Sequence, residues 1–411
     1  MTSRAVTDPS ADPPSPLTKR RAPAETVDAS VGVMFDVVRT RAGFDALAAD
    51  WDALFERSAR SEHMFLNFNW LWHWANHYLP AAAELGIVTG RRNGRLVLVL
   101  PLLVERVAGL RQLAFMGAPV SQYGDILLDA DAGSAALIEE AWQHARGALQ
   151  PDLFRFAKVR ADATIAPLLT AKGFHVTSKE EAPAATLSAE ATYADFEQRF
   201  PCKLRKNRRR QLRRLEERGP VEIAWHAGTP EAAGAARLAM TLKRAWLNSR
   251  GLMSKAFADT RIDAFFADAV ASTAWPCGVA ISVLSSAGEN ADVSISVTCK
   301  GRRAIHVLAY ALKFEKVGVG NHHLELALQR AYADGIAVYD FLAPHHAYKM
   351  EWADTVVVVA DHALALSPLG KLYADIYLAR VREGLKALVK RLPRGFTRVL
   401  AGAHRSTHGV L

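Results

Sequence analysis

The chain has little cysteine: Cys202, Cys277 and Cys299 are the only three in 411 residues, and no two of them form a C-x-x-C pair. Structural zinc sites and disulfide frameworks need clustered cysteines, so this pattern argues against both and is typical of a reducing compartment. The adjacent His345 and His346 have no carboxylate at ligand spacing. We therefore expect neither a metal site nor a disulfide framework.

Long apolar runs are also missing. The longest, Leu96–Val104, is interrupted by Pro101 and is too short to cross a bilayer. The N-terminus contains Asp8 and Asp12 among several prolines and lacks the apolar core of a signal peptide. We therefore expect a cytoplasmic protein.

The composition is that of a folded protein, with 50% hydrophobic and 23% charged residues. A length of 411 residues exceeds a comfortable single core, so two domains are expected. Lysine and arginine outnumber acids by 51 to 42, which gives a formal net charge of +9. This charge favours an anionic partner such as nucleotide phosphates, an acidic polymer or a membrane surface.

The organisation along the chain follows from composition and periodicity. Residues 1–32 are rich in proline, serine and alanine and are predicted to be a disordered leader. Two similar units follow, 33–188 and 189–365, each with the order hairpin, loop, helix, strand. The tail, 366–411, begins with a basic amphipathic helix over 368–392. Such a helix either packs on the protein's own body or lies on an anionic membrane.

The second unit carries the most informative pattern. It predicts a strand at Arg303–Tyr310, a loop at Lys316–Gly320, a helix at Asn321–Asp334 stopped by Gly335, and a strand at Ile336–Leu342. A helix entrance lined by glycines presents free N–H groups and the positive end of the helix dipole, so it can hold a phosphate. Alternatively, the glycines only form a tight turn with positive φ.

The first unit differs at the corresponding place, because Asp129 and Asp131 precede its helix at 134–149. These carboxylates suit the helix dipole and would repel a phosphate, so we expect the first unit to contribute substrate contacts and scaffolding. The aromatic segment Phe65–Trp74 could be a platform for a sugar, but aromatic residues are also the largest contributors to cores. We favour the core.

The residues Tyr339–Leu342, followed by Tyr348–Lys349 and Trp352, resemble a known motif. With Gly320 and Gly335 around the helix, residues 33–365 resemble the GNAT superfamily of acyl-CoA-dependent N-acyltransferases. The likeness is greatest to the CelD-like branch, associated with cellulose and exopolysaccharide, and to the FemAB-type tandem fold. It implies an α/β (α+β) fold of two tandem GNAT-like domains, each a mixed, mainly antiparallel sheet flanked by helices.

The resemblance also implies an activity: transfer of an acetyl or other acyl group from acyl-CoA to a small-molecule or saccharide amine, in polysaccharide or envelope biosynthesis. It places the cofactor against five consecutive residues: Val317, Gly318, Val319, Gly320 and Asn321. Two departures from the family pattern stand out. Glu315 replaces the usual glutamine or arginine, so Lys316 or a rotation of Glu315 must compensate, and Gly318–Val319–Gly320 replaces a frequent Ser-Pro-Gly.

Three residues are candidates for catalysis. Tyr348 lies where GNAT enzymes often place the acid for the thiolate, unless it only fixes its segment to the core. His306 could accept the amine proton, or could be a satisfied structural side chain. Asp340 is a base, an anchor for the amine or a structural partner of Lys349. Lys349 and Tyr310 are candidate substrate contacts.

The segment Lys203–Arg214 has eight basic residues in twelve positions on a predicted helix. It is either a solvated face, a collar for an acidic substrate or the cofactor phosphates, with Arg205 as a candidate substrate contact, or a nucleic-acid surface. The last alternative keeps open a FemAB-like transferase that uses aminoacyl-tRNA as donor. A third possibility is a binding module that kept the fold and lost turnover.

Overall fold

The computed structural model describes residues 32–374 and 376, apart from 81–82, 132–134, 253 and 273–276. The described elements belong to the unit Val33–Leu411. The predicted leader and the predicted tail helix beyond its first turn lie outside the described residues.

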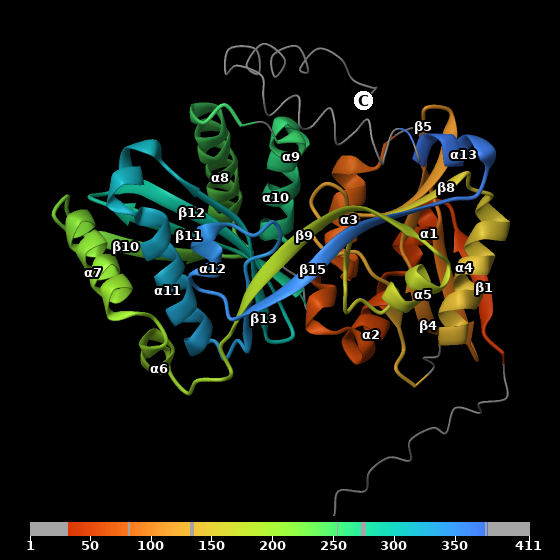
Figure 1. Ribbon diagram of the computed structural model, residues 1–411, viewed down its shortest axis with the longest axis horizontal. Coiled ribbons are helices and arrows are strands. Elements are labelled where there is room, and N and C mark those ends of the chain that lie inside the picture. The colour runs from red at the N-terminus through yellow and green to blue at the C-terminus, as the bar shows by residue number, and fades with distance from the viewer. Residues whose placement is uncertain are drawn as a thin grey trace, which may run out of the picture. The chain divides into compact units, whose positions relative to one another are not determined.

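The first half of the chain forms the elements on the right of Figure 1. They are β1 (Met34–Val38), α1 (Arg41–Ala46), α2 (Ala48–Ser58), the 3-10 helix η1 (Ser61–Leu66), α3 (Phe68–Tyr78), β2 (Glu84–Leu85), β3 (Ile87–Arg92), β4 (Arg95–Leu100), β5 (Leu102–Val107), β6 (Leu110–Phe115), β7 (Leu127–Leu128), α4 (Ala135–Leu149), β8 (Leu153–Arg160), α5 (Ala166–Ala171) and β9 (His175–Thr186).

The second half continues with helices and strands that are interspersed along the chain. They are α6 (Tyr193–Gln198), α7 (Cys202–Glu216), β10 (Val221–His226), α8 (Pro230–Ser249), α9 (Lys255–Ala258), α10 (Arg261–Ala271), β11 (Cys277–Ser286), β12 (Glu289–Cys299), β13 (Arg302–Tyr310), the 3-10 helix η2 (Leu312–Val317), α11 (Val319–Ala333), β14 (Val338–Asp340), α12 (Ala347–Met350), β15 (Thr355–Ala365) and α13 (Pro368–Leu372).

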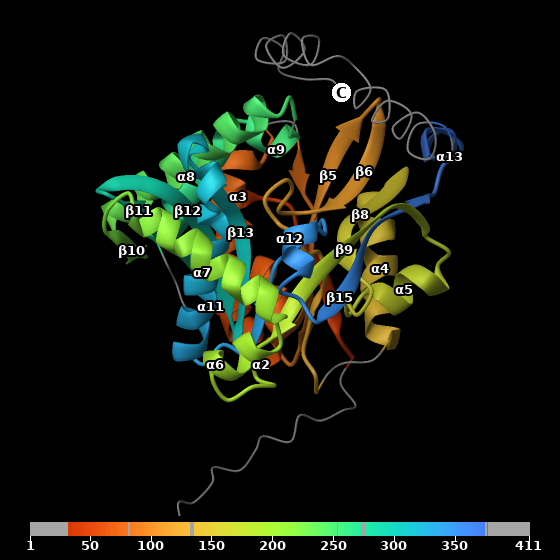
Figure 2. The ribbon, with the colours of Figure 1, turned by 60° about the vertical axis from the view of Figure 1, so that its left-hand side comes forward.

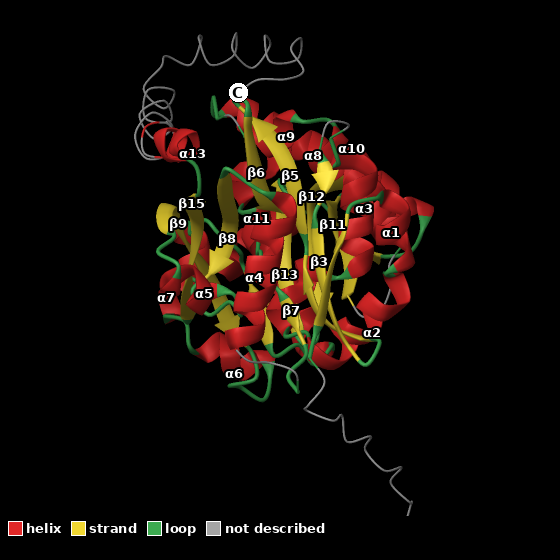
Figure 3. Cartoon of the chain, turned by 90° about the vertical axis from the view of Figure 1, so that its right-hand side faces the viewer, coloured by secondary structure: helices red, strands yellow, loops and turns green. Residues whose placement is uncertain are grey.

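The strands form two sheets, one of four strands in the order β1-β3-β4-β7 and one of eleven in the order β10-β11-β12-β13-β14-β9-β15-β8-β6-β5-β2. Helices flank them (Figure 3). The apolar run Leu96–Val104 is divided between the sheets, because β4 ends at Leu100 and β5 begins at Leu102. Pro101 between them has no N–H to donate to a ladder, which explains the break.

The two halves exchange strands at the middle of the large sheet. The late strand β15 lies between β9 and β8 of the first half, and β9 lies between β14 and β15. The two pair antiparallel from Thr355 with Ala184 to Ala363 with His175, and they run side by side in Figure 1. The sheet is therefore continuous across the proposed boundary at residue 188, and that boundary remains a prediction.

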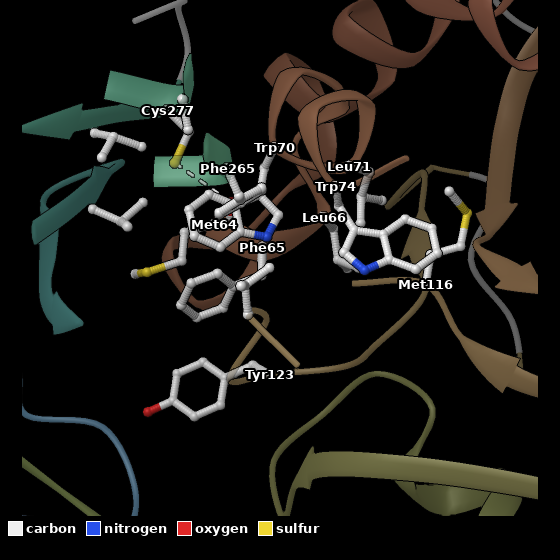
Figure 4. Close-up of a cluster of buried hydrophobic side chains, with 14 of the residues drawn as sticks. Met64, Phe65, Leu66, Trp70, Leu71, Trp74, Met116, Tyr123, Phe265 and Cys277 are labelled. Carbon is white, nitrogen blue, oxygen red and sulfur yellow. Dashed lines mark hydrogen bonds between the residues drawn. The ribbon is translucent and has the colours of Figure 1, made fainter. Parts of the chain in front are cut away.

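The aromatic segment lies in the core. Phe65, Trp70 and Trp74 are buried (Figure 4). The ring of Trp70 packs edge-on against Phe265 of α10, with centroids 4.9 Å apart. The core interpretation is confirmed, and these side chains join α3 of the first half to α10 of the second.

Candidate functional site

The strands β13 and β14 separate in the middle of the second half. They pair in parallel only over Arg302–Ala304 and Val338–Asp340, whereas β13 continues to Tyr310 and stays paired with β12. Figure 2 shows α12 beside β13. Backbone groups on an unpaired strand edge need partners, so this edge can accept an extended ligand that carries amides.

A β-bulge at His306 marks the point of separation. Val307 pairs with Ile295 and Ile305 with Ser296, so His306 is the extra residue on β13. Bulges re-aim side chains and are frequent beside active sites. The bulge thus sets His306 at the start of the open edge.

The hydrogen bonding of His306 determines its tautomer. Its Nε2 lies 2.6 Å from the carbonyl oxygen of Val120 in the first half, and a carbonyl can only accept, so Nε2 carries the proton. Nδ1 is buried without a hydrogen-bond partner in the described structure and keeps its lone pair. Burial lowers the pKa of His306 to about 4, so the ring is neutral at pH 7.

The entrance of α11 begins at Gly318, which has φ of 70°. Among the described residues we find no hydrogen-bond acceptor for the amides of Val319 and Gly320. The side chain of Gln211 on α7 lies over this turn: a Cβ on Gly318 would be 2.5 Å from its Cδ. A phosphate that reaches these amides must therefore displace Gln211.

A carboxylate that the sequence analysis missed also lies at this entrance. Asp292 is fully buried, and a Cβ on Gly320 would be 3.4 Å from its Oδ2. Its Oδ1 is 3.4 Å from Nδ1 of His323, whose Nε2 is 2.6 Å from the Ser282 hydroxyl. The second helix entrance is thus not free of acidic groups, contrary to the contrast drawn from the sequence. Asp292 lies in β12 between the apolar residues Ala291 and Val293. This position is the one feature of the sequence that could have indicated its burial.

The charge of Glu315 is compensated by a residue that the sequence analysis did not single out. Arg250, just after α8, forms an ion pair with Glu315, in place of the expected Lys316. The hydroxyl of Tyr310 donates to the same carboxylate at 3.3 Å and accepts from Trp246 Nε1 at 2.9 Å. Tyr310, a predicted substrate contact, is therefore engaged with its neighbours.

The short helix α12 supplies Tyr348 and Lys349. Tyr348 is 38% exposed, and partial burial, helped by the Asp292 carboxylate, raises its pKa to about 12. Its phenol is therefore protonated at neutral pH. Lys349 is buried and donates to the carbonyls of Leu342 at 2.8 Å and Pro344 at 2.9 Å, and burial lowers its pKa to about 8. It fixes the segment that carries Tyr348.

Asp340 lies in a saturated network between the halves. Its carboxylate accepts from the Tyr123 hydroxyl at 2.9 and 3.0 Å, from Arg302 at 3.0 Å and from the Leu342 amide at 2.9 Å. Asp340 thus bonds to these three groups, whereas Lys349 bonds to the carbonyls of Leu342 and Pro344. The expected pairing of Asp340 with Lys349 is therefore not a direct hydrogen bond. Of the three candidate roles, this geometry favours a structural one.

The basic helix α7 mostly faces solvent. Its exposed members are Lys203, Lys206, Arg209, Arg210, Arg213 and Arg214. Arg205 is partly buried, and its guanidinium donates to the side-chain oxygen of Gln198 at 2.6 Å. This hydrogen bond involves neither Tyr348 nor His306. Arg208 is the exception: it is 5% exposed and its guanidinium lies 3.4 Å from the ring centroid of Trp352.

In the first half, the strand edge that corresponds to the open edge of β13 is covered. There β6 and β8 pair in parallel only over Gln112–Ala114 and Leu153–Arg155. The loop after β6 then lies between them, with the Gly124 amide bonded to the Lys158 carbonyl at 3.0 Å. A Cβ on Gly124 would be 2.7 Å from the Phe115 ring. The protein's own loop occupies the edge that is open in the second half.

The comparisons with known proteins agree with this geometry. Residues 203–350 match the family model described as acetyltransferase (GNAT) domain. No curated protein matches the chain.

Solved structures match over most of the chain. The chain is similar to FemX over 80% of its own length and 98% of that chain, at 12% identity and a TM-score of 0.55. It also covers 95% of the C-terminal domain (DUF2156) of a putative lysylphosphatidylglycerol synthetase from Agrobacterium fabrum with 81% of its length, at 13% identity and a TM-score of 0.52. A tandem GNAT protein from the clavulanic acid biosynthesis pathway matches at 12% identity, over 82% of this chain and 99% of the other, with a TM-score of 0.45. Such identities concern the fold, and the predicted fold class is confirmed.

Two further features are absent from the described residues. No helix there is long and apolar enough to span a bilayer. The same residues contain no group of three or more His, Cys, Asp or Glu side chains placed to hold a metal ion.

Proposed function

We propose that the protein transfers an acyl group from acetyl-CoA or another acyl-CoA to an amine. The observation that carries this proposal is the separation of β13 and β14 at the His306 bulge, within the residues that match the GNAT domain. The amides of a pantetheine arm would pair with the open edge of β13, as an added strand does. The phosphates would lie toward Val317–Asn321, after displacement of Gln211.

The residues beside this edge suit direct transfer. The amine nitrogen attacks the thioester carbon, a C–N bond forms and the C–S bond breaks. Nδ1 of His306 has the free lone pair to receive the amine proton, directly or through water. Tyr348 is protonated and supplies a proton to the departing thiolate, and exchange with water restores both groups.

Binding of the donor is tested by calorimetric titration with a panel of acyl-CoAs. Gly320→Asp adds a second carboxylate beside Asp292 and should weaken acyl-CoA binding at least tenfold by repelling the phosphates. Gly320→Asn has the same shape without the charge and should bind at least threefold better than Gly320→Asp. If Gly320→Asp binds as well as the parent, the proposed donor site is wrong.

The acid role is tested with Tyr348→Phe. Loss of a general acid should lower turnover about 10²-fold or more while the acyl-CoA dissociation constant stays within a factor of two. Tyr332→Phe is the matched control, because the Tyr332 hydroxyl has no hydrogen-bond partner within the part of the chain that the structure describes. Unchanged turnover in Tyr348→Phe would remove Tyr348 from the mechanism.

A second candidate function rests on the exposed basic face of α7. We infer that an aminoacyl-tRNA donor, as in FemAB-like transferases, is the main rival, because six basic side chains there are exposed. Retention of tRNA in a mobility-shift assay, with affinity falling steeply between 50 and about 200 mM salt, would favour it. Acyl-CoA turnover without tRNA would exclude the need for it.

We also place the protein in the CelD-like branch, in the cytoplasm, with an acceptor of polysaccharide or envelope biosynthesis. The support is the Tyr348–Lys349…Trp352 motif and the pairing of Cys277 with Cys299 on neighbouring strands as free thiols. Acetylation of a soluble amino-sugar panel tests the acceptor class. The proposed membrane contact falls on the tail outside the described residues.

A further inference from the structure

The large sheet ends in an edge strand whose outer backbone groups are unused. β10 is the first strand in the order of the sheet, at the left of Figure 2, and its only strand neighbour among the described residues is β11. The amide of Ala287, just after β11, donates to the Pro220 carbonyl at 2.9 Å, and in an antiparallel ladder alternate residues face the same neighbour. The N–H and C=O groups of Val221, Ile223 and Trp225 therefore point away from β11. Within the described part of the chain they have no hydrogen-bond partner.

This edge lacks the features that commonly keep strand edges apart. Its six residues include no lysine and no proline, and its register with β11 runs without a bulge from Val221 to His226. The opposite edge strand of the same sheet, β2, has only two residues, Glu84 and Leu85. Two residues offer too few backbone groups to hold an added strand. Of the two edges of this sheet, β10 is therefore the one that can accept a further strand.

The two faces of β10 both have side chains that a further strand would cover. Ala224 and His226 lie toward α8, where they line a hollow of about 360 Å³. Glu222 lies on the same face by alternation, and Glu222 and Ala224 are exposed. On the opposite face Ile223 and Trp225 are only partly buried. The strand thus presents polar and small side chains on one face and large apolar ones on the other.

We propose that β10 pairs antiparallel with β10 of a second copy of this chain, so that the large sheet continues through a two-fold dimer. A two-fold axis through the strand pair places one residue opposite itself. With Ala224 on the axis, Ile223 lies opposite the partner's Trp225, and these are residues whose backbone groups are free to bond. This pair also joins a branched and an aromatic side chain, which favours strand pairing.

The same register matches the side chains on the other face. Glu222 lies opposite the partner's His226, where its carboxylate accepts a hydrogen bond from the imidazole, and the symmetry forms this pair twice. At the axis Ala224 meets its own copy, and two methyl groups allow the close approach of a non-hydrogen-bonded pair. The alternative register with Ile223 on the axis places Glu222 opposite Ala224 and has no such polar pair. This self-complementarity commits the edge to a second copy of the chain.

The dimer does not involve the proposed donor site. β13, with its open edge, is three strands inward from β10 in the order of the sheet. Both copies therefore keep the edge of β13 free, and acetyl-CoA should not change the association. The inference stands whether or not the proposed transferase function is correct.

Association is measured by sedimentation velocity at protein concentrations between about 1 and 100 µM. The parent should show a concentration-dependent equilibrium between monomer and dimer. Ala224→Lys sets two ammonium groups against each other at the axis and should raise the dissociation constant at least about tenfold. Val358→Lys is the matched control, because Val358 is 39% exposed on the inner strand β15, and it should leave the constant within about twofold of the parent.

Two results of this measurement would overturn the proposal. A dimer of unchanged affinity in Ala224→Lys would place the contact on another face of the molecule. A parent that stays monomeric at about 100 µM would show that β10 does not pair with itself, and would leave the edge to the tail of this chain or to another protein.

Disulfide trapping tests the register and does not depend on the folding of Ala224→Lys. It uses a Cys202→Ser background, because Cys202 is exposed and the other two cysteines are buried. In Ala224→Cys the two thiols lie opposite each other, with Cα atoms about 4.5 Å apart, so oxygen with a copper–phenanthroline catalyst should link most of the dimer. Glu222→Cys is the control, because its two thiols are more than about 13 Å apart and should not link. Equal cross-linking in both variants, or none in Ala224→Cys, would refute the pairing.

Discussion

Tyr123→Phe is the most direct test of how the two halves are joined. Tyr123 lies in the first half, and its hydroxyl donates to Asp340 of the second half, where the Arg160 guanidinium of the first half also lies 3.8 Å from the carboxylate. Both side chains are buried, at 4% and 1% exposure. The substitution keeps the ring and opens no cavity, so it removes the hydrogen bonds alone.

The expected loss follows from the partners that remain. A hydrogen bond to a charged group contributes about 1.5–3 kcal/mol. Asp340 keeps Arg302 and the Leu342 amide, so the carboxylate is not left unpaired. We expect a loss of about 2 kcal/mol in the free energy of unfolding. Asp340→Asn also breaks the buried ion pair and should cost more, about 3–5 kcal/mol.

The assay is urea denaturation followed by circular dichroism and tryptophan fluorescence. Because β9 and β15 are exchanged between the halves, both probes should report one transition, shifted to lower urea in Tyr123→Phe. Tyr78→Phe is the matched control: Tyr78 is equally buried, its hydroxyl has no hydrogen-bond partner among the described residues, and its loss should change stability by less than about 0.5 kcal/mol. Equal shifts in the two variants, or separate transitions for the two probes, would refute the reasoning.

Three further predictions concern the second half. The pKa of His306 is about 4 in the folded protein and near 6.5 in the unfolded chain. The free energy of unfolding should therefore be unaffected by His306 above pH 6.5 and should fall, by at most about 3 kcal/mol, as the pH is lowered from 6.5 to 4. In His306→Gln the urea midpoint should depend less on pH over that range. A pH dependence equal to that of the parent would contradict the argument that burial lowers the pKa. Gly318→Ala should lower the free energy of unfolding by about 1–2 kcal/mol, because φ is 70° and the new Cβ meets Gln211. Gly320→Ala makes ordinary contacts and should melt near the temperature of the parent. Equal melting temperatures of the two variants would show that Gly318 is not constrained. Lys349→Met leaves two carbonyls without their donor and should lower the free energy of unfolding by about 1–3 kcal/mol, measured by thermal denaturation. An unchanged melting temperature would show that water replaces the ammonium.

Local elements could be predicted because their signals are local. The strand expected at Arg303–Tyr310 is Arg302–Tyr310, and the helix expected at Asn321–Asp334 is Val319–Ala333. The strand expected at Ile336–Leu342 is shorter, Val338–Asp340, because the chain turns away where the sheet opens. The edge strand β10 was missed, although Val221, Ile223 and Trp225 alternate with the other three residues of the strand, which is the period of a half-buried strand.

The candidate site was predicted only in part. The motif led to Tyr348 and Lys349, and the strand pattern led to His306. The partner of His306 could not be found in this way, because Val120 is 186 residues away in sequence.

By itself, the amino-acid sequence determined most of the local helices and strands and which of its stretches resembles an acyltransferase motif, whereas the division into two similar units stays a prediction. These properties depend on neighbours within a few residues. Only the tertiary structure decided that β9 and β15 change places, that Asp340 is held between the halves, and that one strand edge is filled by a loop and the other left open. Those outcomes depend on pairing and burial between residues far apart in the chain, and local periodicity does not encode such pairing.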